Sequence, residues 1–445
     1  MKVRMDWKKL LKPQRFAHDL KTYNPDRSEF QRDFDRIIFS EKFRRLHGKT
    51  QVFPFPETDL IHNRLTHSLE VSSVGRSLGT IVGNKLHEKN PFIQGWEMGQ
   101  ICSAACLAHD IGNPPFGHTG EDAISEYFNS NKGMEMLKDL SAEEREDFLQ
   151  FEGNAMGFHI LTHSNRKKTK VRGGFSLTYP TLAAFTKYPR PSVIIDKKDR
   201  VSEDKYGIFQ CDLDTYKEIA FSLGIPYKKE GDRWYRHPLS FLTEAADDIC
   251  YVIMDLEDGY KNGQVTYEKA AHYLISIAHA ESGNTTINSL DKIIDREEKI
   301  AYLRAKAINS LANQTAGVFL DNEDKILTGE FDEPITTMIE SYQLLKEILE
   351  LSREEIYTHK PVIQIGAAGF QVLPGLLDTF LSALKDNKKS RSKMILKLLP
   401  DEYIFDFQEE PYEAIMSITG YIAGMTDTFA VDTYRNLMGI KLPNY

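Results

Sequence analysis

The spacing of apolar residues along the chain predicts a protein built almost entirely of α-helices. Apolar side chains recur every three or four residues, the period that gathers them on one face of a helix. Four segments show this period most clearly: 30–45, 65–86, 96–109 and 238–260. Alternating β-branched runs are scarce, and the best strand candidate is 225–235, where Gly231 and Asp232 predict a tight turn. The pattern therefore predicts an all-α fold with at most a small β-hairpin.

Breaks in this pattern divide the chain but mark no flexible linker. Glycine, proline and polar residues predict loops at 54–58, 112–117 and 164–174, and a longer irregular stretch at 188–212. Beyond Gly263 the helical pattern resumes, and the sequence contains no repeat of fixed period. We therefore expect three parts: an N-terminal segment 1–29, a helical core 30–265 and a C-terminal helical region 266–445 packed on the core.

The composition is that of a folded protein without a membrane span. Of 445 residues, 41% are hydrophobic and 27% are charged, which is enough to bury a sizeable core. No apolar stretch approaches the roughly 20 residues of a spanning helix, and the basic segment 1–11 has no apolar run behind it, unlike a secretory signal. Four cysteines in this length predict free thiols rather than a disulfide framework. We expect a cytoplasmic protein.

The formal net charge of −9 argues against general, charge-driven binding of nucleic acid. It does not exclude an anionic substrate, because a metal ion and a few local cations can reverse the field inside one pocket. Two basic clusters stand out, at 166–172 and 388–393. We expect a solvated loop at each, with contact to a polyanion as the alternative.

The first candidate for chemistry is His109 with Asp110, at the end of the apolar run 101–108. An imidazole beside a carboxylate can ligate one cation or bridge two, and the pair suits manganese, iron, zinc or hydrated magnesium. A His-Asp dipeptide is short enough to occur by chance. The glycines and prolines of 112–117 then force an irregular turn, after which a new helix is expected to begin.

Two further patterns are ambiguous from spacing alone. His118 and Glu121 are three residues apart, so they share a helix face, and the carboxylate would orient the imidazole for proton transfer. Electrostatic capping of the helix explains that pair equally well. Asp247, Tyr251 and Asp255 recur every four residues on one face, which either faces solvent or lines a pocket.

Three longer blocks together resemble the bacterial deoxyguanosinetriphosphate triphosphohydrolases of the HD-domain superfamily. They are 63–70 (NRLTHSLE), 108–118 (AHDIGNPPFGH) and 244–251 (EAADDICY). Shorter segments similar to the same family are 43–46, 50–54, 151–154, 177–182, 236–238 and, more loosely, 425–427. The resemblance runs in the expected order over about 30–260, and it implies an HD-domain helical core there.

The resemblance also implies a role for individual side chains. The metal ligands that it implies are His67, His109, Asp110 and Asp247. The catalytic pair would be His118 and Glu121. The substrate-binding residues would be Gln51, Arg64, Lys187, Tyr188, Tyr251 and Asp255. Among the last set, the tyrosine at 251 would stack on deoxyribose, the aspartate at 255 would accept the 3′-hydroxyl, and the cations would contact phosphates.

The reaction implied is metal-dependent hydrolysis of dGTP, or of a range of deoxynucleoside triphosphates, to the deoxynucleoside and inorganic triphosphate. The cofactor would be a divalent cation, with magnesium, manganese and iron all compatible with the ligands. One alternative is another HD-type nucleotide phosphohydrolase, a 5′-nucleotidase or a phosphodiesterase, although the matches at Gln51, Tyr251 and Asp255 weigh against it. The other is a regulator that binds nucleotide or single-stranded DNA.

The expected partners also come from the resemblance. It implies a homo-oligomer, with a hexamer as one option, and single-stranded DNA or a deoxynucleotide as an effector; no membrane partner is expected. The sequence leaves open the base preference, the physiological metal and the number of ions in each site. It also leaves open whether His118 serves as acid or as base.

Overall fold

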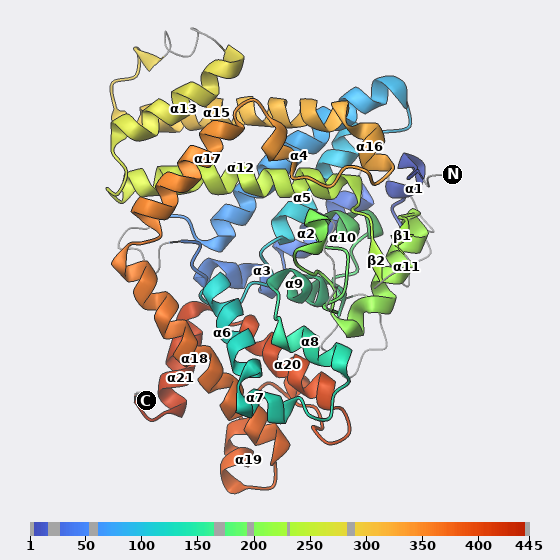
Figure 1. The fold of residues 1–445 in the computed structure, drawn as a ribbon, viewed down its shortest axis with the longest axis vertical. Helices are drawn as coiled ribbons and strands as arrows, with labels where there is room; N and C mark the ends of the chain where they lie inside the picture. The colour runs from blue at the N-terminus through green and yellow to red at the C-terminus, as the bar shows by residue number, and fades with distance from the viewer. Residues whose placement is uncertain are drawn as a thin grey trace.

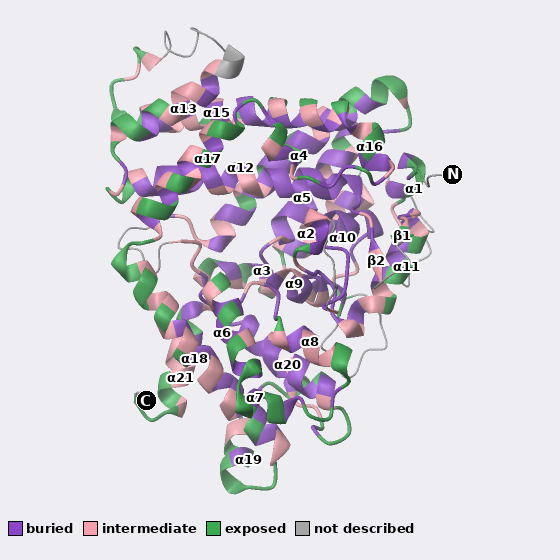
Figure 2. Ribbon diagram, viewed as in Figure 1, coloured by how far each residue is buried: buried purple, intermediate pink, exposed green. Residues whose placement is uncertain are grey.

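Long helices dominate the computed structural model (Figure 1). The structure describes residues 4–16, 27–52, 61–163, 174–193, 200–228, 232–282 and 290–440. Three helices form its centre: α4 (Arg64–Lys89), α5 (Gly95–Ala108) and α12 (Pro238–Lys261). Each covers a segment that the apolar period predicts, so those predictions are confirmed. Figure 2 shows that these central helices are largely buried.

The other elements surround this centre. Before α12 they are α1 (Trp7–Leu10), α2 (Glu29–Ile38), α3 (Glu41–Arg44), η1 (Arg45–Gly48), α6 (His118–Asn129), α7 (Asn131–Met136), α8 (Ala142–Leu149), α9 (Gly153–Thr162), α10 (Tyr179–Phe185), η2 (Val201–Glu203), η3 (Gln210–Asp212), α11 (Leu213–Leu223), β1 (Tyr227–Lys228) and β2 (Arg233–Trp234). After it come α13 (Tyr267–Ser282), α15 (Arg296–Asp321), α16 (Glu323–Leu327), η4 (Ile335–Met338), α17 (Tyr342–Leu351), η5 (Ser352–Ile356), α18 (Lys360–Lys385), α19 (Ser390–Leu396), η6 (Asp401–Tyr403), α20 (Pro411–Ala423) and α21 (Asp427–Leu437). The η elements are 3-10 turns, except η5, which is a π-helical turn.

The central helix α4 begins where its sequence provides a cap. The side chain of Asn63 accepts hydrogen bonds from the backbone N–H groups of Leu65 and Thr66, at 3.1 and 3.0 Å. The hydroxyl of Thr66 accepts one in return from the N–H of Asn63, at 3.1 Å. This reciprocal capping box satisfies N–H groups that the first turn leaves free. It fixes the start of α4, and with it the direction of the first-turn side chains.

Two hydrophobic clusters form the core. The first joins α2, α5 and α10 with α4, α12, α13 and α15. The second joins α6 and α8 with α18, α20 and α21, which follow more than 200 residues later in the chain and occupy the lower part of Figure 1. Each cluster therefore contains residues from both sides of position 265, and the division of the chain into domains stays a prediction.

The sequence analysis expected no apolar stretch as long as a membrane-spanning helix, but one described helix, α18, is long and apolar enough to cross a membrane by length and composition alone. Half of its most apolar stretch is buried, and the helix packs against α6, α19, α20 and α21. A core helix of a globular protein has the same composition, so the finding is weak evidence for a membrane.

The predicted fold class is confirmed, and a few local predictions change. The strands β1 and β2 pair antiparallel as the only sheet among the described residues, with Tyr227 opposite Trp234. The predicted helix 30–45 is divided into α2 and α3 by a break at residues 39–40, where the side chain of Ser40 caps α3 by accepting a hydrogen bond from the N–H of Phe43. The cysteines are free thiols, as expected. The predicted loop 54–58 and the basic cluster 166–172 lie outside the described residues.

Candidate active site

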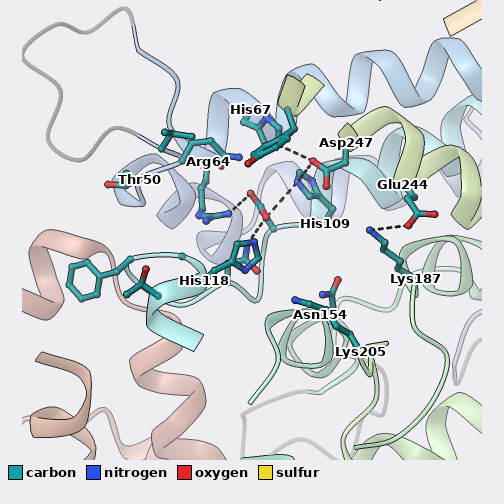
Figure 3. Close-up of a pocket in the computed structure, with 18 of the residues that line it drawn as sticks. Thr50, Arg64, His67, His109, His118, Asn154, Lys187, Lys205, Glu244 and Asp247 are labelled. Atoms are coloured by element: carbon teal, nitrogen blue, oxygen red, sulfur yellow. Dashed lines mark hydrogen bonds and ion pairs between the residues drawn. The ribbon is translucent and has the colours of Figure 1, made fainter. Parts of the chain in front are cut away.

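One pocket of about 550 Å³ gathers side chains from α4, α6 and α12 and from the loops after α5 and α10 (Figure 3). Its wall contains ten of the twelve residues that the sequence nominated: Gln51, Arg64, His67, His109, Asp110, His118, Lys187, Tyr188, Asp247 and Tyr251. The other two, Glu121 and Asp255, lie behind the wall and hydrogen-bond to residues on it. The structure therefore brings the whole nominated set together.

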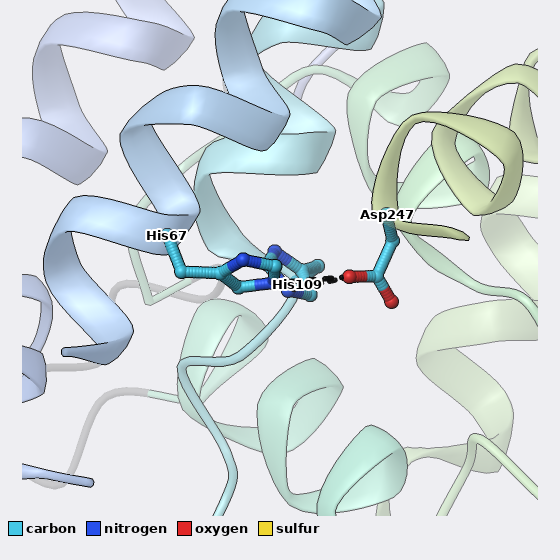
Figure 4. Close-up of side chains that lie close together, drawn as sticks. All are labelled: His67, His109 and Asp247. Atoms are coloured by element: carbon cyan, nitrogen blue, oxygen red, sulfur yellow. Dashed lines mark hydrogen bonds and ion pairs between the residues drawn. The ribbon is translucent and has the colours of Figure 1, made fainter. Parts of the chain in front are cut away.

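Three nominated metal ligands converge on one point (Figure 4). Nε2 of His67, from the first turn of α4, is 3.1 Å from Oδ1 of Asp247 on α12. Nε2 of His109, the residue that ends α5, is 3.4 Å from the same oxygen. The two imidazole rings meet edge to face, with centroids 5.2 Å apart. Ligand atoms about 2.1 Å from a common ion lie at such separations from one another.

Backbone contacts orient one of these ligands. Nδ1–H of His109 donates to the carbonyl oxygen of Cys106, at 2.7 Å, which leaves the lone pair of Nε2 directed at the cluster. Burial alone would raise the pKa of Asp247, but the neighbouring His109 and His67 outweigh it and lower that pKa. The carboxylate is therefore charged, as a ligand must be.

The adjacent residue Asp248 takes a different position. Its carboxylate accepts a hydrogen bond from the hydroxyl of Thr336, at 2.7 Å, and burial raises its pKa to about 7. Of the two neighbouring aspartates, only Asp247 faces the two histidines.

The fourth nominated ligand, Asp110, lies beside this trio but is held by other groups. Oδ1 of Asp110 is 3.6 Å from Nε2 of His109, and its second oxygen accepts from the Arg64 guanidinium at 2.7 Å. The side-chain amide of Asn113 donates to Oδ1. Two imidazoles and two carboxylates suit a divalent cation such as Mn²⁺, Fe²⁺ or Zn²⁺, so the residues present fit the group that the sequence predicts.

The nominated proton-transfer pair stands at the start of α6. Nδ1 of His118 donates to Oε2 of Glu121 at 2.8 Å, and Oε1 of Glu121 accepts from the N–H of Gly153 at 2.8 Å. The His118 side chain is 80% exposed whereas that of Glu121 is 9% exposed, so a buried carboxylate holds an accessible ring. The hydrogen bond that His118 donates to Glu121 raises the pKa of His118.

The loop before α6 explains how His118 reaches the pocket. Phe116 and Gly117 both have positive φ, 67° and 62°, so the chain reverses sharply there. A Cβ atom added to Gly117 would lie 2.7 Å from a terminal nitrogen of Arg64. Asp427, at the start of α21, accepts from the N–H of Phe116 at 3.1 Å and from that of Thr50 at 2.9 Å. The C-terminal region thus fixes two segments of the pocket wall.

Three cations lie on the pocket wall, each held by a buried carboxylate. Arg64 pairs with Asp110, and Nζ of Lys187 lies 3.0 Å from Oε1 of Glu244. Nζ of Lys205 lies 3.1 Å from Glu152. Figure 3 shows Lys187 and Lys205 on one side of the pocket and Arg64 on the other. The pairing fixes the position of each cation and leaves its remaining donors for a ligand.

A group of hydroxyls and one carboxyl closes the end of the pocket near α12. The hydroxyl of Tyr357 donates to the carboxylate of Asp255 at 2.5 Å and lies 2.6 Å from that of Tyr251. Asp255 is 4% exposed, and burial raises its pKa to about 7. In this structure Asp255 is therefore covered by Tyr357 and does not itself line the pocket.

Two buried polar atoms at the pocket have no hydrogen-bond partner among the described residues: Oε1 of Gln51 and Nε of Arg64. A buried polar atom without a partner costs about 1–3 kcal/mol. A polar ligand in the pocket would offset that cost.

Sequence reasoning missed several residues of this site. Tyr357 and Lys205 line the pocket, yet no pattern around them pointed to it, and Asn154 lies in the family-like segment 151–154 but was not singled out. Glu244 lies within a family-like block and three residues before Asp247, so its position on the same helix face was the available signal.

Comparison with known proteins matches the same parts of the chain. An HD domain matches residues 64–204, and a phosphohydrolase-associated domain matches residues 336–436. The chain is 42% identical to a deoxyguanosinetriphosphate triphosphohydrolase-like protein of Synechocystis, over 98% of this chain and 100% of that protein. A protein of the same description from Pseudomonas aeruginosa is 39% identical, over 99% and 100%. A deoxyguanosinetriphosphate triphosphohydrolase of Salmonella paratyphi A is 30% identical, over 93% and 94%.

Proposed function

Since this chain belongs to the deoxyguanosinetriphosphate triphosphohydrolase-like family of HD-domain proteins, we propose that it hydrolyses deoxynucleoside triphosphates to the deoxynucleoside and inorganic triphosphate. The observation that carries the proposal is the composition of one pocket. A cluster of metal-binding side chains, an imidazole paired with a carboxylate, and three cations line the same 550 Å³. We take dGTP as the first substrate to test.

We propose that His67, His109, Asp110 and Asp247 hold a divalent cation. When bound, such an ion supplies Lewis-acid polarisation at the phosphate and favours ionisation of water. The imidazole nitrogens of His67 and His109 face one oxygen of Asp247, which supports this assignment.

The cations would neutralise the triphosphate. Arg64 offers a planar guanidinium, which matches a pair of phosphate oxygens, and its Nε has no partner among the described residues. Lys187 and Lys205 add two ammonium groups on the other side. Because the carboxylates behind them hold all three side chains in place, little ordering remains to be done when the substrate binds.

His118 would act as the general acid. Hydrolysis adds the oxygen of water to the α-phosphorus and breaks the bond from that phosphorus to the 5′-oxygen, which must then gain a proton. The hydrogen bond with Glu121 raises the pKa of His118, which favours the protonated ring that a general acid needs. Its Nδ1 is committed to Glu121, and Nε2 bonds to no described residue, so Nε2 is the nitrogen free to give that proton.

The sugar and base would lie between α12 and Gln51. The Tyr251 ring would stack on deoxyribose, and Asp255 would accept the 3′-hydroxyl once Tyr357 shares or releases its bond. The unpartnered Oε1 of Gln51 would accept from the sugar or base edge. Assembly into a homo-oligomer and binding of single-stranded DNA or a deoxynucleotide as effector stay predictions.

The test is identification of the products. Purified protein is incubated with each of the four deoxynucleoside triphosphates and with GTP, in the presence of Mg²⁺ or Mn²⁺, and the products are separated by anion-exchange chromatography. We expect tripolyphosphate and a deoxynucleoside, with little turnover of GTP. Release of orthophosphate or pyrophosphate would overturn the proposal in favour of another nucleotide phosphohydrolase. Equal turnover of GTP would refute the proposed sugar contact.

A further inference from the structure

A second group of metal-binding side chains lies outside the pocket, at the carboxyl end of α9. His159 and His163 are four residues apart and share one helix face, and Asp212 of η3 faces them both. Nδ1 of His159 is 2.9 Å from one carboxylate oxygen of Asp212, and Nδ1 of His163 is 2.8 Å from the other. The imidazole rings stack, with centroids 4.2 Å apart. Among the described residues, only this trio and the one in the pocket bring three such ligand atoms within 4.8 Å of one another.

The separations are close to those of a tetrahedral zinc site. Two nitrogen or oxygen ligands about 2.1 Å from zinc lie about 3.4 Å apart, and a nitrogen and a thiolate sulfur about 3.6 Å apart. The two distances between Asp212 oxygens and imidazole nitrogens are about half an ångström shorter than the roughly 3.4 Å expected between two ligands of one zinc ion. A small rotation of the carboxylate would lengthen them. Sγ of Cys211 is 3.7 Å from Nδ1 of His159, close to the second value. The thiol is therefore the nearest candidate for a fourth position.

The electrostatic setting favours a cation. The carboxylate of Asp212 is fully buried, and each of its oxygens faces one imidazole. The carboxyl end of a helix carries partial negative charge. Glu413 of α20 adds a further negative charge beside His163. The side chain of His163 is 43% exposed whereas that of Asp212 is fully buried, so an ion could enter from solvent and be held from within.

The alternative is a hydrogen-bonded cluster without an ion, in which each imidazole donates Nδ1–H to one oxygen of Asp212. That arrangement accounts for the two short contacts. It does not use the contact between the thiol of Cys211 and His159, although that thiol also hydrogen-bonds with Tyr412.

We propose that His159, His163 and Asp212, with Cys211 as fourth ligand, form a second metal site that takes Zn²⁺ and fixes the carboxyl end of α9. The other end of this helix begins at Gly153, whose N–H donates to Glu121. The ion would thus stabilise the helix that supports the pair at the pocket. The site is separate from the proposed hydrolysis and does not depend on it.

The test counts zinc ions on the full-length protein. The protein is stripped with a chelator, dialysed against a zinc buffer and then against metal-free buffer, and analysed by inductively coupled plasma mass spectrometry. We expect two ions per chain in the wild type and one ion in each of the single variants Asp212→Asn and His163→Gln. The variant His109→Gln alters only the pocket cluster and should also hold one ion. The double variant His109→Gln with His163→Gln should hold none. His272→Gln removes an exposed histidine of α13 and should keep both.

A second set of measurements distinguishes loss of the ion from unfolding of the variant. Asp212 is buried, so its variant is checked by circular dichroism; the half-exposed His163 gives the milder substitution. Zinc should raise the Tm of His109→Gln but not that of His109→Gln combined with His163→Gln. One ion per chain in the wild type that His163→Gln retains, or two in both Asp212→Asn and His163→Gln, would overturn the proposal. Loss of the second ion in Cys211→Ser but not in Asp212→Asn would also overturn it, because the ion would then be a thiol adduct. None of these measurements requires hydrolysis.

Discussion

Replacement of Glu121 by glutamine tests the proposed acid most sharply. Both carboxylate oxygens of Glu121 accept hydrogen bonds, one from Nδ1 of His118 and one from the N–H of Gly153, each at 2.8 Å. A glutamine has one oxygen, so its amide N–H₂ must face one of these two donors. A buried donor that loses its acceptor costs about 1–3 kcal/mol, and the free energy of unfolding should fall by that amount.

The same substitution changes the protonation of His118. The carboxylate raises the pKa of His118, so its removal lets that pKa fall toward the ordinary value of about 6.5. His118 then loses its proton at lower pH, and the alkaline limb of the kcat profile should move to lower pH. General acid catalysis contributes about 10²–10⁴-fold, so we expect kcat to fall within that range.

The linked effect on stability has a defined sign. The folded-state pKa of His118 lies above its unfolded value, so the pair stabilises the fold fully below about pH 6.5. That contribution is lost as the pH rises through the folded-state pKa. The difference in unfolding free energy between wild type and Glu121→Gln should therefore be larger at pH 6 than at pH 9.

The assay follows release of tripolyphosphate from dGTP between pH 5.5 and 9.5 for the wild type and two variants. The control is Asp122→Asn, which neutralises the adjacent, exposed carboxylate and should leave both kcat and its pH profile unchanged. If Glu121→Gln keeps the wild-type kcat and the same alkaline limb, Glu121 does not act through His118, and the reasoning fails.

Four further predictions follow from the packing and the pocket. His109→Gln or a chelator should lower activity at least 10³-fold, and excess Mn²⁺ should restore the chelated wild type but not the variant. Gly112→Ala should cost about 3 kcal/mol or more in chemical denaturation, because its Cβ would lie 2.1 Å from the nitrogen of Gly157; Gly317→Ala, with nothing within 4 Å, is the control and should not destabilise the fold. Asp427→Asn should lower the free energy of unfolding by about 1–3 kcal/mol, because one of its two backbone donors loses an acceptor; an unchanged value would contradict the bonds seen here. Tyr357→Phe should likewise cost about 1–3 kcal/mol, because the buried Asp255 loses its donor, and an equal stability would show that solvent replaces the hydroxyl.

The long central helices could be predicted from the sequence because local forces specify them. The apolar period of α4 reflects one buried face, the more continuous apolar runs of α5 and α12 reflect burial on nearly all sides, and the Asn63 cap marks where α4 begins. The apolar period did not reveal the break at Ser40, where a side chain caps the start of a second helix. Local capping decided that boundary.

The site depends on contacts that no local pattern records. His67 and Asp247 are separated by 180 residues, and only family resemblance joined them before the structure placed them 3.1 Å apart. Tyr357 and Asp427 come from the C-terminal region, where Tyr357 packs against the first hydrophobic cluster and the helix of Asp427, α21, packs in the second. Their contribution follows from packing of helices distant in sequence, so spacing along the chain could not reveal it.

The most direct test of the proposed reaction is the fate of the oxygen of water. Hydrolysis of dGTP in water enriched in oxygen-18, followed by mass spectrometry of both products, shows which bond is broken. We predict that the label enters tripolyphosphate and that the deoxynucleoside carries none, because water attacks the α-phosphorus. Label in orthophosphate, pyrophosphate or the deoxynucleoside would contradict the account.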